Sequence, residues 1–423
     1  MPTRKSDNPL KHLRSSDIRG IAQLANQATQ GVTSITEGVH LSVLATIGFR
    51  GGRAEGQTRG LTGMVYTSVR VVTQLLGKGL DVTLAALQPL FDMLEGEKPE
   101  TPRREAVLAV LNGVMGDRLV ASENSFAVPM GLRYRGQALE LQSLPPMPKV
   151  TGKVLLMIHG LCMSDLQWHA RNKTPGTDHG EVLASTLGYT PVYVRYNSGL
   201  HTSDNGRELA TQLEQLLGHW PVPVEELCVV AHSMGGLVMR SAVHVAGQQA
   251  MHWPTSLKSI VFLGTPHHGA PLERVGNWLD ALMGSSPYTK PFNALGQIRS
   301  AGITDLRYGH VLDDDWQGYD RFHLRSDQRL PLPLPDGVAC YTVAATKAAR
   351  RSALVDRLIG DGLVPLNSAL GHHAEADRTL GFAQDSQWIA YHTSHMELLS
   401  RPEVTRRLVQ WLSPVPIERA ALR

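Results

Sequence analysis

The stretch Leu227-Cys-Val-Val-Ala-His-Ser-Met-Gly-Gly-Leu237 decides the fold class of this chain. It begins as a short, Val-rich apolar run typical of a buried strand, and it continues after Ser233 as a helix. A serine at a tight turn between a strand and a helix is typical of a nucleophile elbow, which lifts the hydroxyl clear of the sheet and close to a helix N-terminus. Ala231 replaces the usual first glycine, and it suits this crowded backbone because it is nearly as small. The alternative interpretation is an ordinary strand-turn-helix with an incidental serine. Residues at the ends of the other strands must distinguish the two interpretations.

Buried strands and helices alternate along the chain from Asp117 onward. This alternation predicts an α/β fold with a mostly parallel sheet and helices on both faces, in which catalytic groups gather at the carboxyl ends of the strands. An antiparallel pair is expected at 126–141, with its turn at Arg135-Gly-Gln137. The expected core strands are 153–159, 190–196, 227–231, 259–264, 338–344 and 388–391, and the expected helices between them are 180–187, 205–217 and 236–246.

The strand at 153–159 ends in His159-Gly160-Leu161-Cys162. A His-Gly turn at this place supplies one backbone N–H to an oxyanion hole, and the residue after the nucleophile supplies the second. We therefore predict Leu161 and Met234 as the two donors, with Cys162 as the alternative to Leu161. His159 suits a structural role better than that of a base, because it stands at the strand end ahead of a glycine.

Gly360-Asp361-Gly362 follows the strand at 338–344 and predicts the acid of a catalytic triad. An aspartate between two glycines at a strand end is well placed to orient a histidine and to stabilise it when protonated. Asp356 is the alternative, but it lies in a charged run with Arg357, which is typical of a solvated face.

The general base is predicted to be His395, which follows the last strand. Ser400 and Glu403 have the spacing of a capping box, so a final helix should begin there and run to about Leu412. His395 then lies on the loop between the last strand and the last helix, where the general base belongs. His392 competes, but it is closer to the strand. The chain order serine, aspartate, histidine is the one expected for this kind of sheet.

Two pairs of adjacent histidines, His267-His268 and His372-His373, invite a metal interpretation. Neighbouring side chains in an extended loop diverge, and no cysteine or carboxylate stands at ligand spacing, so we predict neither a metal site nor a cofactor. Shaping the edge of the substrate pocket is the preferred role. The predicted substrate-binding residues are His159, Gly160, Cys162, His232, His267 and His268.

With these residues assigned, the chain resembles the α/β-hydrolase superfamily, and within it the bacterial lipase and esterase group. The loops Gly264-Thr-Pro-His-His-Gly-Ala-Pro271 and Gly360-Asp-Gly-Leu-Val-Pro365 are also similar to those of GPI inositol-deacylase-like and triacylglycerol-lipase-like hydrolases. The resemblance covers roughly residues 117–412 and implies a serine hydrolase of carboxylic esters that works through an acyl-enzyme. It also implies that the insert at about 272–335, with an amphipathic helix at 278–283, is a lid; a fixed pocket wall is the alternative.

Composition sets the remaining expectations. The 423 residues suffice for a catalytic domain at 117–423 and a smaller N-terminal helical region at 1–116, in which helices are expected between 18 and 94 around a glycine-rich loop at 48–63. A net charge of +3 gives no reason to expect a nucleic-acid partner.

The three cysteines are expected to be buried free thiols. The polar N-terminus without a secretory signal, and the lack of a spanning apolar run, favour a cytoplasmic location.

Several functional interpretations stay open at this level. The first is an esterase or lipase acting on an ester or lipid substrate. The second is an amidase, thioesterase or acyltransferase on the same triad. The third is a scaffold associated with lipid or polymer granules, in which catalysis is secondary. The N-terminal helices fit a cap on the catalytic domain, a surface for peripheral contact with a membrane or lipid, or a dimerisation element, and the sequence does not set the oligomeric state.

Overall fold

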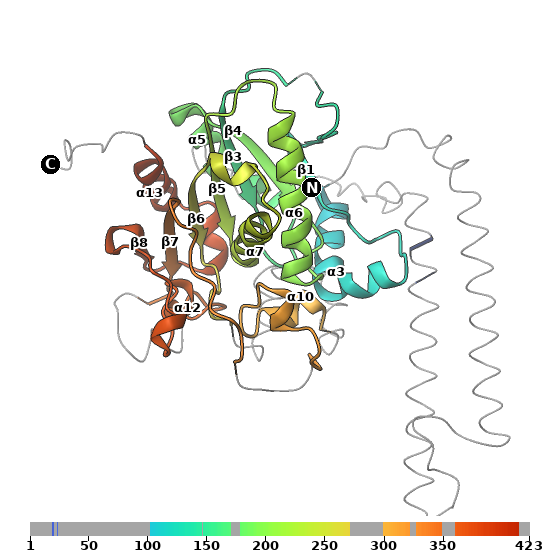
Figure 1. Cartoon of the computed structure of the whole chain (residues 1–423), viewed down its shortest axis with the longest axis vertical. Coiled ribbons are helices and arrows are strands. Elements are labelled where there is room, and N and C mark those ends of the chain that lie inside the picture. Colours follow the sequence, from blue (N-terminus) through green and yellow to red (C-terminus); the bar gives the residue numbers. More distant parts are fainter. Residues whose placement is uncertain are drawn as a thin grey trace, which may run out of the picture. The chain divides into compact units, whose positions relative to one another are not determined.

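The computed structural model describes residues 19–20, 23, 102–145, 147–170, 178–270, 299–321, 327–348 and 360–413 (Figure 1). The helices expected between 18 and 94, the loop at 48–63, the helix at 278–283 and Asp356 lie outside these residues. The chain divides into two compact units, Met1–Arg104 with Leu119–Phe126, and Glu105–Arg118 with Ala127–Arg423. Within the first unit, the Asn124 side chain donates a hydrogen bond to the Gly20 carbonyl at 3.3 Å. None of the described helices combines the length and apolarity needed to cross a bilayer.

An eight-stranded sheet organises the second unit, with the strand order β2-β1-β4-β3-β5-β6-β7-β8. The pairings β2-β1 and β1-β4 are antiparallel, and all others are parallel. The strands are β1 (Gly131–Tyr134), β2 (Gln137–Ala138), β3 (Lys153–Ile158), β4 (Thr190–Arg195), β5 (Glu226–His232), β6 (Leu257–Leu263), β7 (Ala339–Ala345) and β8 (Gln387–Ala390). Each predicted strand is therefore present within two residues of its expected ends, except that the pair at 126–141 is shorter.

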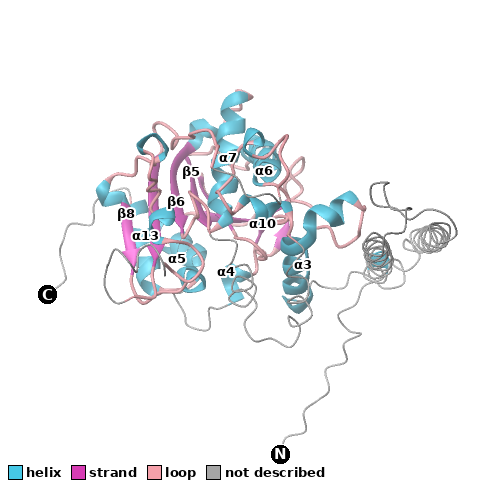
Figure 2. Cartoon of the chain, turned by 90° about the horizontal axis from the view of Figure 1, so that it is seen from below, coloured by secondary structure: helices cyan, strands magenta, loops and turns pink. Residues whose placement is uncertain are grey.

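Helices cover both faces of this sheet, as the alternation of strands and helices predicts (Figure 2). Their bounds are α3 (Pro102–Ala121), α4 (Gln167–Ala170), α5 (His179–Leu187), α6 (Thr202–Gly218), α7 (Met234–Gln248), α10 (Ala301–Asp305), α12 (Leu366–Ala369) and α13 (Pro402–Leu412). Five short 3-10 helices complete the described elements: η2 (Trp253–Ser256), η4 (Asp313–Asp315), η5 (Ala376–Arg378), η6 (Gln384–Ser386) and η7 (His395–Leu399). These residues have an α/β-hydrolase fold.

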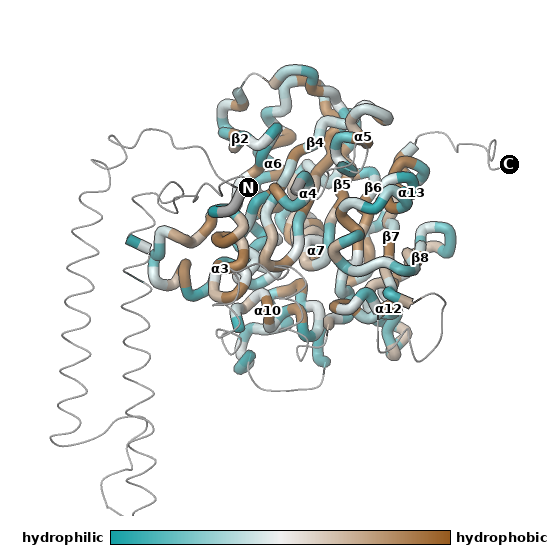
Figure 3. Tube along the Cα trace, turned by 180° about the vertical axis from the view of Figure 1, so that it is seen from behind, coloured by the Kyte–Doolittle hydropathy of each residue, from teal (hydrophilic) through white to brown (hydrophobic). Residues whose placement is uncertain are grey.

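Two apolar cores lie on opposite faces of the sheet, because alternate strand residues point to opposite sides. On one face, even-numbered β3 residues such as Leu156 pack with α6 and α7. On the other face, odd-numbered residues such as Leu155 and Met157 pack with α5 and α13. Hydrophobic residues accordingly gather along the central strands in Figure 3.

One prediction about the last helix is wrong. Pro402 is the first residue of α13, so Arg401 is its N-cap and makes no side-chain capping bond. Ser400 instead ends η7, which begins with a capping box formed by Ser394 and Glu397. The predicted box at Ser400 starts one residue too early for a helix whose first turn is fixed by proline.

Candidate active site

The parallel register brings the carboxyl ends of the central strands to one edge of the sheet. Ile158 pairs with Ala231 between β3 and β5, and His232 pairs with Leu263 between β5 and β6. Ala345 pairs with Ala390 between β7 and β8. The residues that follow these positions therefore emerge at the same edge, and they include Ser233 and the turn after β3.

Ser233 occupies the sharp turn between β5 and α7, at φ 55° and ψ −126°. A positive φ is rare for a residue with a side chain and persists only where surrounding contacts fix it. Here the Ser233 amide donates to the Leu263 carbonyl at 2.8 Å, and the Gly236 amide donates to the Ser233 carbonyl at 3.0 Å. A Cβ on Gly235 would lie 2.5 Å from the His159 oxygen, so only glycine lets α7 start this close to β3.

The Ser233 side chain is almost completely buried, with 1% exposure. Its Oγ has no hydrogen-bond partner among the described residues. A buried hydroxyl without a partner is costly to maintain and is typical of a group kept for chemistry.

The turn after β3 passes directly beside this serine. A Cβ on Gly160 would lie 2.9 Å from the Ser233 Cβ and 3.1 Å from His232 Nδ1. Cys162 has a positive φ of 56°, and its amide donates to Ser198 Oγ at 3.0 Å. Of the two amides considered for the first oxyanion donor, that of Cys162 is thus already bonded, whereas the Leu161 amide has no acceptor among the described residues. Met234, the other predicted donor, is the first residue of α7.

His159 supports this turn from inside the protein. It is fully buried and stacks on Tyr196, with ring centroids 4.3 Å apart. Its Nδ1 donates to the Gly160 oxygen at 2.9 Å, and the Tyr196 amide donates to its Nε2 at 3.4 Å. Burial lowers the pKa of His159 to about 4, so the ring is neutral at physiological pH. Burial likewise raises the pKa of the Cys162 thiol to about 12, which makes it unreactive.

His395 and Asp361 form a buried pair, with His395 Nδ1 2.6 Å from Asp361 Oδ2. Their side chains are 2% and 1% exposed. The second carboxylate oxygen, Asp361 Oδ1, accepts the amides of Leu363 at 2.9 Å and Val364 at 2.8 Å. These two bonds fix the rotation of the carboxylate, and the carboxylate in turn fixes the histidine ring.

Gly264 and His232 join this pair to the elbow. A Cβ on Gly264, whose φ is +61°, would lie 3.1 Å from His395 Nδ1, and the preceding Leu263 carbonyl accepts the Ser233 amide. His232, beside Ser233, donates from Nε2 to the His395 carbonyl at 3.1 Å, and the two rings lie 4.6 Å apart. His232 and the segment Leu263-Gly264 therefore link Ser233 to His395.

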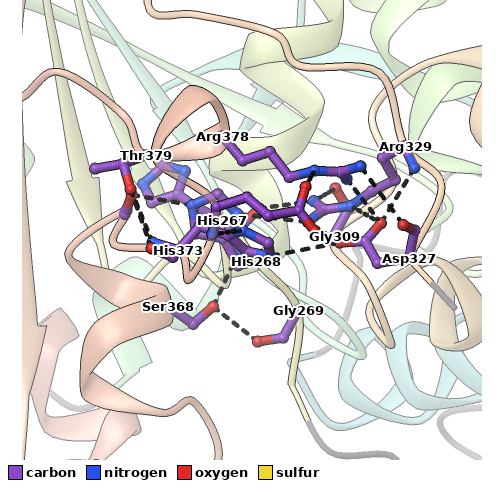
Figure 4. A network of polar contacts seen from close by, with 12 residues as sticks. His267, His268, Gly269, Gly309, Asp327, Arg329, Ser368, His373, Arg378 and Thr379 are labelled. Carbon is purple, nitrogen blue, oxygen red and sulfur yellow. Dashed lines mark hydrogen bonds and ion pairs between the residues drawn. The ribbon is translucent and has the colours of Figure 1, made fainter.

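His267 and His268 lie in a separate polar network that fastens the loop after β6 (Figure 4). Arg329 donates from Nη1 to the carbonyls of His267 and Gly309, both at 3.0 Å, and pairs with Asp327 at 2.8 Å. His268 donates from Nε2 to the Gly371 carbonyl at 3.0 Å. The network ties together the loop after β6, the end of the segment before β7, and the segment after α12.

Burial dominates the electrostatics of these histidines. It lowers the pKa of His268 to about 4 and that of His267 well below its usual value. The His267 ring packs between Phe262 and Phe382. Although burial opposes the effect, hydrogen bonds from Arg329 lower the pKa of Asp327 to about 2. Neutral His267 and His268 beside arginines are consistent with a structural role, in which the network holds the loop after β6 in place.

One group of three potential metal ligands, His169, Asp178 and Glu181, occurs among the described residues, with ligand atoms within 4.8 Å of one another. Its geometry has a simpler explanation. Asp178 is the N-cap of α5: its Oδ1 accepts the Glu181 amide at 3.0 Å, and its Oδ2 lies 2.5 Å from His169 Nδ1. The hydrogen bond with Asp178 raises the pKa of His169. The group thus forms a capped helix start with an ion pair.

Sequence reasoning missed Ser198 and Gly264 as parts of the site. Ser198 belongs to the polar run Asn197-Ser-Gly199 that follows β4, and a polar run at a strand end is the signal that could have found it. Gly264 follows β6, and a Cβ there would crowd His395, which lies more than a hundred residues further along the chain.

The chain was compared with family models, curated proteins and solved structures. Residues 133–297 match the model of a domain of unknown function, DUF7379. No curated protein matches the chain. Solved structures similar to it include the mature lipase BlEst2 of Bacillus licheniformis, at 18% identity and a TM-score of 0.39, over 67% of this chain and 98% of that one. They also include the type II thioesterase YbtT of a yersiniabactin pathway, at 13% identity and a TM-score of 0.37, over 63% of this chain and 94% of that one. A third is an esterase of Pyrococcus furiosus, at 13% identity and a TM-score of 0.34, over 62% of this chain and 81% of that one.

Proposed function

We propose that this protein is a serine hydrolase of carboxylic esters, an esterase or lipase that works through an acyl-enzyme on Ser233, His395 and Asp361. The observation that carries the proposal is the buried pair of His395 and Asp361 at 2.6 Å, held at the sheet edge where the strained Ser233 turn emerges. Structural histidines and aspartates occur in many proteins, but here His395 accepts a hydrogen bond from His232, the residue before Ser233, and the Ser233 hydroxyl has no partner among the described residues.

The proposed reaction runs in two halves. His395 Nε2 takes the Ser233 proton while Oγ attacks the ester carbonyl, and Asp361 stabilises the imidazolium that forms. The amides of Leu161 and Met234 donate to the oxyanion of the tetrahedral intermediate, each contributing about 3–4 kcal/mol. His395 then returns its proton to the leaving alkoxide, which departs as the alcohol.

In the second half, a water molecule gives its proton to His395 and attacks the acyl carbon. The new tetrahedral intermediate collapses, the Ser233 oxygen leaves and recovers the proton from His395, and the carboxylic acid is released. The protein's own groups suffice for every proton transfer in this cycle, so the proposal needs neither a metal ion nor a cofactor.

Labelling with a fluorophosphonate probe, followed by mass mapping, tests the proposal. We expect the label on Ser233 in the wild type and none in Ser233→Ala. Ser259→Ala is the matched control, because Ser259 is also buried but lies within β6 and donates to Cys228 Sγ at 3.3 Å. A series of p-nitrophenyl esters from acetate to palmitate then measures turnover. Substantial turnover by Ser233→Ala would refute the mechanism, and labelling of Ser233 without hydrolysis of any ester would refute the ester substrate.

A further inference from the structure

Helix α3, which precedes the whole sheet in the sequence, packs directly against the turn after β3. A Cβ on Gly113 would lie 2.3 Å from Cys162 Sγ and 2.8 Å from both the Cα and the N of Cys162. Backbone atoms cannot move aside as the end of a flexible side chain can. The helix backbone at Gly113 therefore sets the position of the Cys162 backbone, one residue beyond the predicted oxyanion donor.

The loop after β4 makes the second contact with the same turn. Ser198 is 1% exposed, and its Oγ accepts the Cys162 amide at 3.0 Å. Its neighbour Asn197 donates from Nδ2 to the Gly116 carbonyl of α3 at 3.1 Å. On the other side of Ser198, a Cβ on Gly199 would lie 2.1 Å from the Asn112 carbonyl. The loop is thus held between α3 and the turn.

Helix α10, from the segment between β6 and β7, closes the arrangement. Ser300, its N-cap, donates from Oγ to the Gly113 carbonyl at 2.6 Å. A Cβ on Gly302 would lie 2.1 Å from the Ser198 carbonyl and 3.1 Å from Met234 Cε. One helix therefore contacts α3, the loop after β4 and the residue after the nucleophile.

Buried charges tie the start of α3 to the same loop. Arg195, the last residue of β4, pairs with Glu105 of α3 at 2.9 Å and with Asp165 at 2.5 Å. All three side chains are at most 7% exposed. Asp165 lies three residues after Cys162, so α3 contacts the turn directly at Cys162 and is linked to Asp165 through Arg195.

We propose that α3 is a positioning element of the oxyanion hole: Gly113 and Ser198 hold Cys162 in its left-handed conformation and so aim the Leu161 amide at the substrate carbonyl. A cysteine adopts a φ of 56° only when its surroundings impose it. If the turn relaxes, the Leu161 amide changes direction while Ser233, His395 and Asp361 keep their places. This inference rests on the proposed function, because the amide has a catalytic task only in an enzyme that forms an oxyanion.

Gly113→Ala tests the inference, with Gly247→Ala as its matched control. Both glycines lie within helices, where alanine is the better helix former. Only Gly113 touches the turn, whereas a Cβ on Gly247 in α7 would meet nothing within 4 Å. Loss of one oxyanion donor lowers kcat by about 100- to 1,000-fold. We expect Gly113→Ala to lower kcat by about 10- to 100-fold, since the donor is displaced and not removed, with KM little changed and Gly247→Ala like the wild type.

A pair of inhibitors separates positioning from general loss of structure. A trifluoromethyl ketone forms a tetrahedral adduct with a serine hydrolase and places an oxyanion in the hole, whereas the matching methyl ketone mimics the bound ester. In Gly113→Ala and in Ser198→Ala, we expect the inhibition constant of the trifluoromethyl ketone to rise by the same factor by which kcat/KM falls. The constant of the methyl ketone should stay within about twofold of the wild type.

The two variants and the two inhibitors give distinct outcomes. Equal weakening of both ketones in both variants would overturn the positioning role, and so would wild-type kcat in a folded Gly113→Ala. If Gly113→Ala does not fold, Ser198→Ala decides alone, because it removes only the acceptor of the Cys162 amide. A wild type in which Ser233 takes no fluorophosphonate label would instead overturn the proposed function, and the inference would fall with it.

Discussion

The substitution Asp361→Asn gives the most specific prediction of the site, because the structure dictates how an asparagine must orient there. Asp361 Oδ1 accepts two backbone amides, those of Leu363 and Val364, and Oδ2 faces His395 Nδ1 at 2.6 Å. The asparagine oxygen has to keep the two amide bonds, since its NH2 group would oppose two donors. The NH2 group therefore faces His395 and donates to Nδ1.

This orientation forces the His395 proton onto Nε2, the nitrogen that must accept the proton of Ser233. The ring then presents a donor where the mechanism needs a base. A wrong tautomer of this kind lowers kcat by about 10⁴-fold, which corresponds to about 5.5 kcal/mol in the activation free energy. The fold should persist, because asparagine keeps the shape of the side chain and both amide bonds.

The assay is p-nitrophenyl ester turnover, measured beside urea unfolding of the same preparations. Asp315→Asn is the matched control: Asp315 is buried, and its Oδ2 accepts the amides of Val311 at 2.8 Å and Leu312 at 2.9 Å. It is expected to keep wild-type kcat. More than a tenth of wild-type activity in a folded Asp361→Asn would refute the assignment of Asp361 as the residue that orients the base.

Three further predictions concern stability and geometry around the site. Gly264→Ala places a Cβ about 3 Å from His395, so we expect kcat to fall at least about tenfold in ester kinetics. Because the φ of Gly264 is +61°, we also expect the free energy of unfolding to fall by about 1–2 kcal/mol in urea unfolding. Glu105→Gln removes one charge from the buried group around Arg195 and should cost about 3–5 kcal/mol in urea unfolding, whereas Glu226→Gln, in the more exposed pair with Lys153, should cost at most about 1 kcal/mol. Burial lowers the pKa of His159 from 6.5 to about 4. Between about pH 6.5 and pH 4 this side chain is therefore protonated in the unfolded chain but neutral in the folded chain. Stability should therefore fall as the pH drops from about 6.5 to 4, by up to about 3 kcal/mol for this group; urea midpoints that do not change between pH 7 and pH 4.5 would contradict this.

Local signals in the sequence were sufficient to predict the strands of the sheet and to choose candidate site residues at the strand ends. The apolar runs that form β3, β5, β6 and β7 are continuous because both faces of a parallel sheet are buried, so they stand out without any knowledge of their partners. Asp361 could be chosen because it lies between two glycines, and the two have positive φ values of 47° and 100°. The start of α13 was misplaced because Ser400 and Glu403 imitate a capping box, whereas Pro402 fixes the first turn.

The turn after β3, which we propose as part of the oxyanion hole, shows why other parts of the candidate site could not be predicted from local patterns. Leu161 and Cys162 were both candidates for the donor, and nothing between β3 and α4 distinguishes their amides. Ser198, which lies 36 residues further along the chain, distinguishes them, because its hydroxyl accepts a hydrogen bond from the Cys162 amide.

A trace of this arrangement is nevertheless present in the sequence of α3. Gly113 lies within α3 and Gly116 follows the kink of this helix at Met115. Inside a helix a glycine costs about 1 kcal/mol relative to alanine. That cost has a physical reason if another group approaches closely: the Cys162 backbone does so at Gly113, and the Asn197 side chain does so at Gly116. A glycine inside a helix can therefore indicate that the helix touches something at that point, but not which strand end it touches. The identity of the contact depends on the three-dimensional register of α3, β3 and β4, and this register follows from packing across the whole sheet.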